Sequence, residues 1–330
     1  MKILIIHNGV IPAKLYGGIE RVIWCLGKEL VKMGHQVTYL VGEGSSCDFA
    51  TVLCLDKGKG VLEQVPEDID LAHFNFAPLE IAEFKKPYVI TFHENSNNQN
   101  EFDLNTIFVS ENHAYRYGSN SFVQNGLDWD DYTNPSFSAA RTYFHFLGSA
   151  DWRVKNVKGA IDVVTHTQSE KIKVLGGVRF NVTMGIRFTF TPRASFYGMV
   201  GGKEKDLLLQ HSKGLIFPVI WNEPFGLAII ESLFFGCPVF GTPYGSLPEI
   251  VTKEVGFLSA SRDELAHAVE NVNDYSNKRC HDYAREEFSS RKMAKHYMEK
   301  YEKVLSNERL NKNPPKLIQI QEKKFLDWDK

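Results

Sequence analysis

The chain has 330 residues, a length typical of two domains of about 150 residues, each large enough to bury its own core. Its 38 basic and 40 acidic side chains give a net charge of −2, and 43% of the residues are hydrophobic against 24% charged. These values exclude a disordered chain and a polyanion-binding surface, so nucleic acid is not expected as a partner.

The cysteines indicate a reducing compartment, because their number is odd and no two have the C-x-x-C spacing of a zinc or redox site. The first apolar run is too short for a signal peptide, and no window reaches the ~18 apolar residues of a membrane span. We therefore expect a cytoplasmic protein. The cysteines, expected to be packing residues, are Cys25, Cys47, Cys54, Cys237 and Cys280.

The first part of the chain begins with a β-α-β pattern. Apolar runs at 3–6 and 37–41 flank a stretch whose apolar residues recur with helical spacing; Gly17 and Gly18 stand at its start and Gly34 is a plausible C-cap. Continuously apolar runs of this kind are typical of parallel strands covered on both faces. Further strands are expected at 51–55, 71–74, 88–92, 107–110 and 122–124.

The pattern breaks at 127–139 and then restarts, so we place a domain boundary there and expect domains at 1–138 and 139–330. In the second domain the helices are predicted from about Val157, near Lys203 and from Pro224. Helices from about Arg262 are expected to pack back on the N-terminal domain. We therefore predict two Rossmann-like α/β halves with the ligand between them. The strands are expected at 143–147, 172–175, 196–200, 215–219 and from Val239.

The most informative stretch is WNEPFGLAIIE, residues 221–231. Pro224 suits a first helical turn, so the amides of 225–227 would form an anion site there. Glu223 and Glu231 are eight residues apart, up to roughly 12 Å along a helix, whereas paired glycosidase carboxylates lie about 5–9.5 Å apart. We therefore predict that they grip different parts of one extended ligand around a phosphate, as in a nucleotide sugar. The simpler interpretation is a helix-start acid and a solvated acid.

The longer stretch NEPFGLAIIESLFFGCPVFGTPYGSLPEIV resembles the donor site of retaining GT-B glycosyltransferases of the E-x7-E type, the glycosyl transferases group 1 family. GGIERV, DIDLAHFNF, VITFHEN, FVSENHAYRYG, VQNGLDWDDY and YGMVGGKEKDLLLQHSKGLIFPV are weaker matches. The resemblance implies two Rossmann-like domains facing each other across a cleft. It also implies a metal-independent hexosyltransferase that acts on a nucleotide diphosphate sugar, by family frequency a UDP sugar, in bacterial glycan or glycoconjugate synthesis.

The resemblance also implies roles for individual residues. Glu223 and the backbone of 225–227 would hold the sugar and the distal phosphate, Glu231 the ribose, and the loop at 17–18 the phosphates, while His93 would face the transferred sugar. The implied catalytic residues are His93, Glu223 and Lys155. The implied donor-binding set is Gly17, Gly18, Gly148, Ser149, Arg153, Lys155, Met199, Val200, Glu223, Pro224, Phe225, Gly226, Leu227 and Glu231.

One phosphate-binding cation of the family is missing. Ser149 stands where the family usually has Arg, which matters because charge stabilisation of the leaving diphosphate is the main catalytic lever. Lys155 is our choice for the family's Lys, although Lys158 with Gly159 also resembles that motif. Arg153 or Lys158 would then replace the missing Arg, or both are plain surface charges.

Other motifs and functions are weaker matches. The D-x-D patterns at 128–130 and 327–329 resemble metal sites, but so short a pattern arises often by chance, and we expect neither a metal nor a cofactor. His7 and Asn8 follow the first strand and border the expected cleft. The alternatives are a nucleotide-sugar epimerase, a sugar phosphorylase or a catalytically degenerate nucleotide-sugar-binding protein. The expected acceptor is a saccharide, a lipid-linked saccharide or a small molecule, with peripheral contact at the inner face of a membrane, and the short stretch 171–196 predicts a compact acceptor side.

Overall fold

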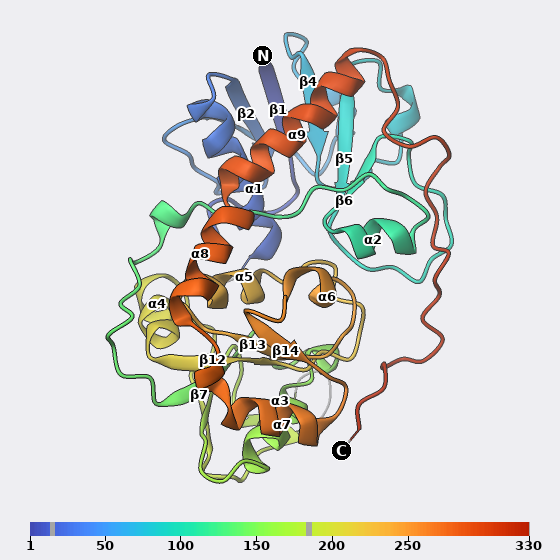
Figure 1. Ribbon diagram of the computed structural model, residues 1–330. Coiled ribbons are helices and arrows are strands. Elements are labelled where there is room, and N and C mark those ends of the chain that lie inside the picture. Colours follow the sequence, from blue (N-terminus) through green and yellow to red (C-terminus); the bar gives the residue numbers. More distant parts are fainter. Residues whose placement is uncertain (14–16, 183–186, 330) are drawn as a thin grey trace. The chain divides into compact units, whose positions relative to one another are not determined.

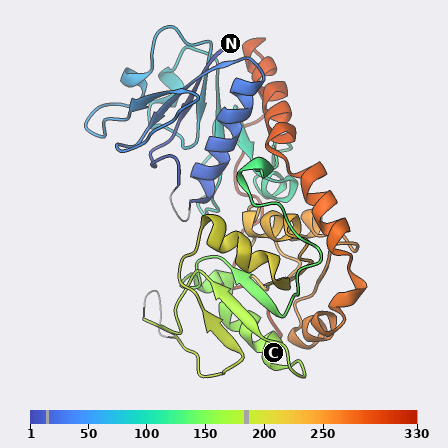
Figure 2. The same ribbon diagram turned by 90° about the vertical axis from the view of Figure 1, so that its left-hand side faces the viewer.

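A computed structural model describes residues 1–13, 17–182 and 187–329 (Figures 1 and 2). The chain forms two compact units. Unit 1 comprises residues 1–128 and 288–320, and unit 2 comprises residues 129–287 and the tail from Gln321. Each unit contains a six-stranded parallel sheet. The short stretch 171–196 lies partly outside the described residues.

The sheet of unit 1 has the strand order β3-β2-β1-β4-β5-β6. Its central strands are almost entirely buried, as the apolar runs predicted, and α9 packs on both α1 and β5. Gly34 follows α1 with a φ of +87°, in agreement with the predicted C-cap. The strands are β1 (Lys2–Ile6), β2 (Gln36–Val41), β3 (Thr51–Cys54), β4 (Leu71–Phe74), β5 (Tyr88–Phe92) and β6 (Thr106–Phe108); the helices are α1 (Gly18–Lys32), α2 (Glu111–Arg116) and α9 (Ser290–Leu305), with 3₁₀ turns η1 (Leu62–Gln64) and η2 (Ile81–Glu83).

Helix α9 is tied to the sheet of unit 1 by buried polar contacts. His73 on β4 bonds the Tyr301 hydroxyl at 2.8 Å through Nδ1 and Thr91 at 2.7 Å through Nε2. Thr91 in turn lies 3.1 Å from the Tyr297 hydroxyl. These bonds satisfy polar groups that would be costly to bury unpaired, so they fix how the helix lies on the sheet.

The sheet of unit 2 has the order β11-β8-β7-β12-β13-β14, and α5 packs on α8 while α3 packs on α7. A short antiparallel hairpin joins β9 to β10. The strands are β7 (Tyr143–Leu147), β8 (Ile172–Leu175), β9 (Phe180–Asn181), β10 (Arg187–Phe188), β11 (Ala194–Phe196), β12 (Ser212–Phe217), β13 (Val239–Gly241) and β14 (Gly256–Leu258). The helices are α3 (Val157–Thr165), α4 (Gly202–Gln210), α5 (Leu227–Phe234), α6 (Leu247–Ile250), α7 (Arg262–Glu270) and α8 (Asn277–Glu287), with 3₁₀ turns η3 (Trp129–Asp131), η4 (Arg153–Lys155) and η5 (Val272–Asp274).

Both sheets have the same topology. Counting only the strands of each sheet in chain order, each reads 3-2-1-4-5-6, so the direction of strand addition reverses between its first and fourth strands. In open parallel sheets, ligands bind beyond the carboxyl ends of the strands at such a reversal. The reversal lies between β1 and β4 in unit 1 and between β7 and β12 in unit 2.

Several predicted elements need correction. Residues 122–124 are no strand, because only an isolated bridge joins Phe122 to Phe108. Strand β11 begins before the predicted 196–200, β12 covers 212–217 rather than 215–219, and β14 was not predicted. Cys54 is exposed and therefore not a packing residue. Within the described ranges, no helix combines the length and apolarity needed to cross a membrane.

Candidate active site

The reversal point of unit 2 brings together the loops that follow β7 and β12. The first loop contains Lys155 in the turn η4, and the second contains Glu223. Their side chains form an ion pair with a distance of 2.5 Å between Lys155 Nζ and Glu223 Oε2. Both residues are buried, with Glu223 6% exposed. Two of the three residues that the resemblance implied as catalytic are therefore in direct contact.

Aromatic rings surround this ion pair. The indole nitrogen of Trp221 donates to Glu223 Oε2 at 2.8 Å. Lys155 Nζ lies 5.0 Å from the Trp221 ring centre and 5.3 Å from that of Phe217. Such rings attract a cation while excluding water, so the ammonium group is fixed in a place of low dielectric constant. An ammonium group has three N–H donors, and a phosphate oxygen can accept one that Glu223 does not use.

The loop after β13 fixes the segment that carries Glu223. Ser246 donates its amide to the Glu223 carbonyl at 2.9 Å and its hydroxyl to the Phe225 carbonyl at 2.7 Å. Gly245 has a φ of +63°, and a Cβ there would lie 2.2 Å from Glu223 N. Only glycine permits this approach, so the GTPYGS part of the motif serves as a support for Glu223.

Helix α5 begins at Leu227, and the prediction that Pro224 starts it is wrong. Gly226 precedes the helix with a φ of +91°, a left-handed conformation that a helix cannot contain. The anion site predicted from the amides of 225–227 is therefore shifted along the chain. The amides of Leu227 and Ala228 are the first two of the helix and have no acceptor within it. Residues 226–228 are partly exposed between buried neighbours, whereas Pro224 and Phe225 are buried.

Glu231 lies four residues into α5 and is only 2% exposed. It forms an ion pair with Lys205 of α4, and the Tyr132 hydroxyl donates to its Oε1 at 2.9 Å. Lys205 also lies over the Tyr132 ring, 5.1 Å from its centre. The interpretation of Glu231 as a solvated acid is therefore wrong, because its carboxylate is buried and bonded to both Lys205 and Tyr132.

The other predicted donor residues of unit 2 are distributed around these two ion pairs. Gly148 follows β7 with a φ of +149°, and Ser149 is partly exposed in the same loop. Arg153 lies over the Phe325 ring, 5.4 Å from its centre, rather than beside Glu223, and Lys158 is exposed on α3. Within the described residues, neither cation forms a hydrogen bond or ion pair with the Lys155 or Glu223 side chain. In the loop before α4, Met199 is exposed and Val200 is buried.

In unit 1, His93 and His7 lie beyond the carboxyl ends of β5 and β1. His93 Nε2 and Asn75 Oδ1 are 2.9 Å apart, and His7 Nε2 and Glu20 Oε1 are 3.4 Å apart. The hydrogen bond from His7 lowers the pKa of Glu20. Gly17 is the N-cap of α1, and a Cβ there would lie 2.7 Å from Glu20 Oε2, so the glycine loop leaves room for this carboxylate. Gly18 is the first residue of α1.

The protonation state of His93 follows from its surroundings. Burial, together with the charge of His7, lowers the pKa of His93 to about 3, so the ring is neutral at physiological pH. Asn75 donates its amide nitrogen to the Ile6 carbonyl at 3.2 Å, which turns its Oδ1 toward His93. His93 Nε2 therefore carries the proton, and Nδ1 is the acceptor nitrogen of the ring.

The D-x-D patterns have other partners. Asp128 pairs with Lys28 at 2.9 Å and with Lys32 at 3.2 Å. Asp327 pairs with Lys323 at 2.6 Å. Across the described part of the chain, no group of three or more His, Cys, Asp or Glu side chains is placed to hold a metal ion.

Five residues of these clusters were missed from the sequence: Asn75, Tyr132, Lys205, Glu20 and Trp221. Trp221 and Glu20 lie inside the quoted motifs, two or three residues from a predicted site residue, and this spacing was the available signal. Asn75, Tyr132 and Lys205 lie in the weaker matches DIDLAHFNF, VQNGLDWDDY and YGMVGGKEKDLLLQHSKGLIFPV, but none of the three was singled out there. Their contacts depend on the tertiary fold, which no local pattern encodes.

Comparisons with known proteins bear on the family and the fold of this chain. Residues 140–287 match the family model described as Glycosyl transferases group 1. A curated protein of Klebsiella pneumoniae, described as an uncharacterized 41.2 kDa protein in the cps region, is 25% identical over 113 residues. That alignment covers 32% of this chain and spans about a third (31%) of the relative's own length.

Solved structures show the same fold over most of the chain. AviGT4, a glycosyltransferase involved in avilamycin A biosynthesis, is 18% identical with a TM-score of 0.74 over 93% of this chain and 98% of its own. The sucrose-phosphate synthase of Thermosynechococcus elongatus is 16% identical, with a TM-score of 0.70 over 93% and 99%. Anabaena HepE, solved with UDP-glucose, is 17% identical, with a TM-score of 0.67 over 91% and 98%. These likenesses concern the fold alone and confirm the predicted pair of Rossmann-like sheets.

Proposed function

The chain belongs to the glycosyl transferases group 1 family, the retaining GT-B glycosyltransferases also called GT4, and from that premise we propose that it transfers a hexose from a UDP sugar to an acceptor hydroxyl. The family predicted from the sequence is thereby confirmed, while donor and acceptor are proposals. The donor is supported by the UDP-glucose bound in Anabaena HepE. Synthesis of a bacterial glycan or glycoconjugate is the proposed setting.

The observation that carries this proposal is the buried Lys155–Glu223 pair at the reversal point of the unit 2 sheet. A cation held at the carboxyl ends of parallel strands, next to the amides that begin α5, suits a diphosphate. Glu223 would hold Lys155 in place and use its remaining acceptor capacity for sugar hydroxyls. The carboxylate and the phosphate would then share the one ammonium group of Lys155. With this arrangement the phosphate would need no second cation at the position of Ser149.

The proposed reaction forms one glycosidic bond and breaks another. The acceptor oxygen attacks the anomeric carbon on the face from which the diphosphate leaves. The bond between that carbon and the diphosphate oxygen breaks, its electron pair stays on UDP, and a diphosphate oxygen takes the acceptor's proton. Lys155 and the amides of Leu227 and Ala228 would stabilise the charge that develops on the leaving group, which is the largest catalytic contribution open to the protein. No protein base and no metal is required.

Two further residues receive proposed roles. Glu231 would bind the ribose hydroxyls in exchange for the Tyr132 hydroxyl, which now bonds its carboxylate. His93, neutral and with Nδ1 as acceptor, would accept a hydrogen bond from a hydroxyl of the transferred sugar. Because its pKa lies near 3, it would orient the sugar rather than take a proton from it.

The test begins with binding and ends with turnover. UDP and UDP-hexoses are expected to raise the midpoint of thermal unfolding of the full chain. Glu223→Gln is expected to abolish release of UDP in a protein that still folds but is less stable, because the Lys155 ammonium group loses its partner. The matched control is Glu254→Gln, an exposed acid paired with Arg279. Release of UDP that requires an acceptor distinguishes a transferase from an epimerase. No thermal shift with any UDP sugar, or activity lost on chelation, would contradict the proposal.

We propose that the β9–β10 hairpin also touches an anionic membrane surface. Its strands and flanks carry five exposed hydrophobic side chains, and the Phe180 ring lies 5.7 Å from Phe188 and 6.1 Å from Phe190. Residues 171–203 contain six Lys or Arg and no Asp or Glu, although the chain as a whole is slightly acidic. Exposed apolar side chains in a basic segment fit the boundary of an anionic bilayer better than a protein partner. The exposed residues are Val178, Phe180, Val182, Phe188 and Phe190.

Co-sedimentation with vesicles tests this contact. Binding to vesicles of phosphatidylcholine with phosphatidylglycerol is expected, weaker at high salt, and lost in Phe188→Ser/Phe190→Ser. Phe257→Ser, on β14, is the matched control because its side chain is also partly exposed. Equal binding of both variants, or concentration-dependent self-association that the hairpin variant abolishes, would overturn the membrane proposal.

A further inference from the structure

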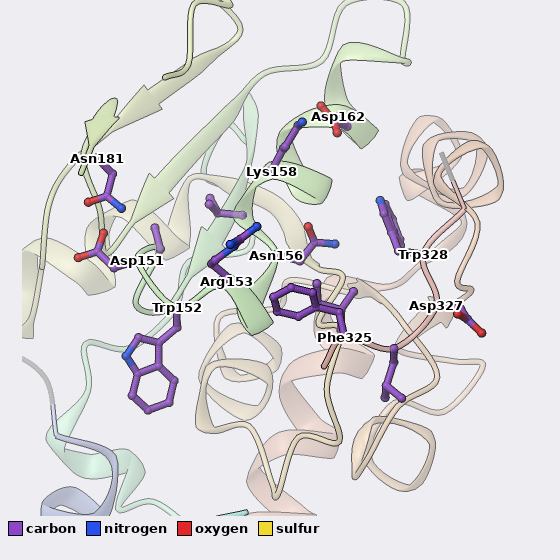
Figure 3. Close-up of a pocket in the computed structure, with 14 residues that line it drawn as sticks. Asp151, Trp152, Arg153, Asn156, Lys158, Asp162, Asn181, Phe325, Asp327 and Trp328 are labelled. Atoms are coloured by element: carbon purple, nitrogen blue, oxygen red, sulfur yellow. The ribbon is translucent and has the colours of Figure 1, made fainter. Parts of the chain in front are cut away.

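A cavity of about 520 Å³ lies in unit 2 apart from the Lys155–Glu223 and Lys205–Glu231 pairs (Figure 3). We call it the tail pocket. One wall comes from the loop after β7 and the first turns of α3, and the other from the tail at 325–328. Its volume is within the roughly 300–1,000 Å³ of small-molecule sites. Neither Lys155 nor Glu223 lines it.

Hydrogen bonds hold the tail wall in place. The Leu326 amide donates to the Ile220 carbonyl at 2.9 Å, and the Asp329 amide to the Ala260 carbonyl at 2.9 Å. The Tyr244 hydroxyl donates to the Asp327 carbonyl at 2.7 Å. The tail is thus attached at two residues of the pocket wall and at one residue just after it, so the pocket is preformed rather than created by its ligand.

The charges around the tail pocket are mixed. Its lining contains three carboxylates and two cations, which excludes the strongly one-signed surroundings of a phosphate or metal site. Arg153 is engaged by the Phe325 ring and Asp327 by Lys323. A neutral, polar ligand fits this balance. The charged lining residues are Asp151, Asp162, Asp327, Arg153 and Lys158.

Two buried polar atoms of the lining lack a hydrogen-bond partner among the described residues. They are Asp151 Oδ1, from the loop after β7, and Trp328 Nε1, from the tail. Figure 3 shows them on opposite sides of the pocket. An unpaired buried polar atom destabilises a protein, so each points to a missing partner. One atom requires a donor and the other an acceptor, and a hydroxyl group supplies either.

A tryptophan at the rim connects the pocket with the Lys155–Glu223 pair. Trp152 lines the pocket and is 46% exposed. Its ring meets that of Trp221 edge to face at 6.3 Å, and Trp221 donates to Glu223. A flat apolar ring beside polar atoms that lack hydrogen-bond partners suits a pyranose, which has apolar C–H faces and hydroxyl groups at its edges.

We propose that the tail pocket binds a neutral hexopyranoside of the acceptor. Asp151 accepts a hydrogen bond from one hydroxyl, Trp328 donates to another, and Trp152 packs on a face of the ring. The assignment to the acceptor rests on the proposed function, whereas binding of the saccharide does not. The pocket would then hold a sugar of the acceptor against Trp152, whose ring contacts Trp221, the tryptophan that donates to Glu223.

The experiment uses the full chain, ¹⁵N-labelled at its tryptophan indoles, with maltose and methyl α-D-glucopyranoside as probes. The chain has five tryptophans, so the indole signal of Trp328 is assigned from Trp328→Phe. Millimolar probe is expected to shift the signals of Trp328 and Trp152. Asp151→Asn and Trp328→Phe should each weaken binding about two- to tenfold, the effect of one hydrogen bond. Asp282→Asn, on α8 and outside the pocket lining, is the control and should change nothing.

Three outcomes decide the proposal. If neither probe shifts the Trp328 signal, or if all three variants bind equally, the saccharide site is overturned. If phosphate shifts it and the sugars do not, the pocket is an anion site and the proposal is also overturned. Binding of UDP, measured in the same variants and expected to be unchanged, separates the two proposals, because its absence in the wild type contradicts the proposed function alone.

Discussion

Replacing Lys155 by Met isolates the contribution of the buried ion pair. The substitution keeps the length of the side chain and its apolar stem but removes the ammonium group. The Glu223 side chain is only 7% exposed, and its carboxylate then keeps the hydrogen bond from Trp221 as its side-chain partner. Removing one partner of a buried pair destabilises a protein by about 3–5 kcal/mol, because the remaining charge is uncompensated. For a unit of this size that corresponds to a fall of roughly 6–20 °C in the midpoint of thermal unfolding.

The double variant separates this explanation from a simple packing defect. In Lys155→Met/Glu223→Gln neither position carries a charge, so most of the lost stability should return, although UDP release should stay at least about 10²-fold below wild type. Urea titration followed by tryptophan fluorescence measures the free energy of unfolding of all variants. Lys158→Met, three residues along and exposed, is the control. A Lys155→Met protein as stable as this control, or a double variant no more stable than the single one, would refute the reasoning.

Three further predictions concern other sites. Gly245→Ala should destabilise the protein more than Gly34→Ala in urea titrations, because both have a positive φ but only Gly245 would press a Cβ on the Glu223 backbone; equal losses would contradict that support. Burial lowers the pKa of His145 to about 3, so the unfolded state, with a pKa near 6.5, binds a proton that the folded state excludes. Stability should be full above about pH 6.5 and decrease toward pH 3, and His145→Gln should flatten this slope; a slope unchanged by the substitution would show another origin. Tyr132→Phe removes the hydroxyl that bonds Glu231 and should tighten UDP binding, as measured by calorimetry, whereas weaker binding would show that this hydroxyl positions the carboxylate for its ligand.

The fold was largely predictable because its signals are local. Continuous apolar runs mark the central parallel strands, and the helical spacing with Gly34 fixes α1. The predicted start of a helix was wrong where a single backbone angle determines where that helix begins. The left-handed conformation of Gly226 moves the start of α5 past a proline that by sequence alone is an ideal first residue.

The candidate site was predictable only in part. Glu223 and Lys155 could be named from a motif, but their direct contact depends on the strand order, which places the loops after β7 and β12 side by side. Sequence could not show that Arg153 lies on Phe325, since residues 172 positions apart meet only through the tail. The roles assigned to the individual donor residues remain predictions.

The path of the chain between the units affects how the protein can be made. Tyr297 and Tyr301, which close over His73 and Thr91, follow nearly all of unit 2 in the sequence. On the ribosome, the body of unit 2 therefore emerges while unit 1 still lacks the helix that seals its sheet. A chain cut after Asp128 would leave unit 1 without the helix that covers His73 and Thr91. Each unit draws on two separate segments of the sequence, so neither corresponds to one uninterrupted stretch of the gene.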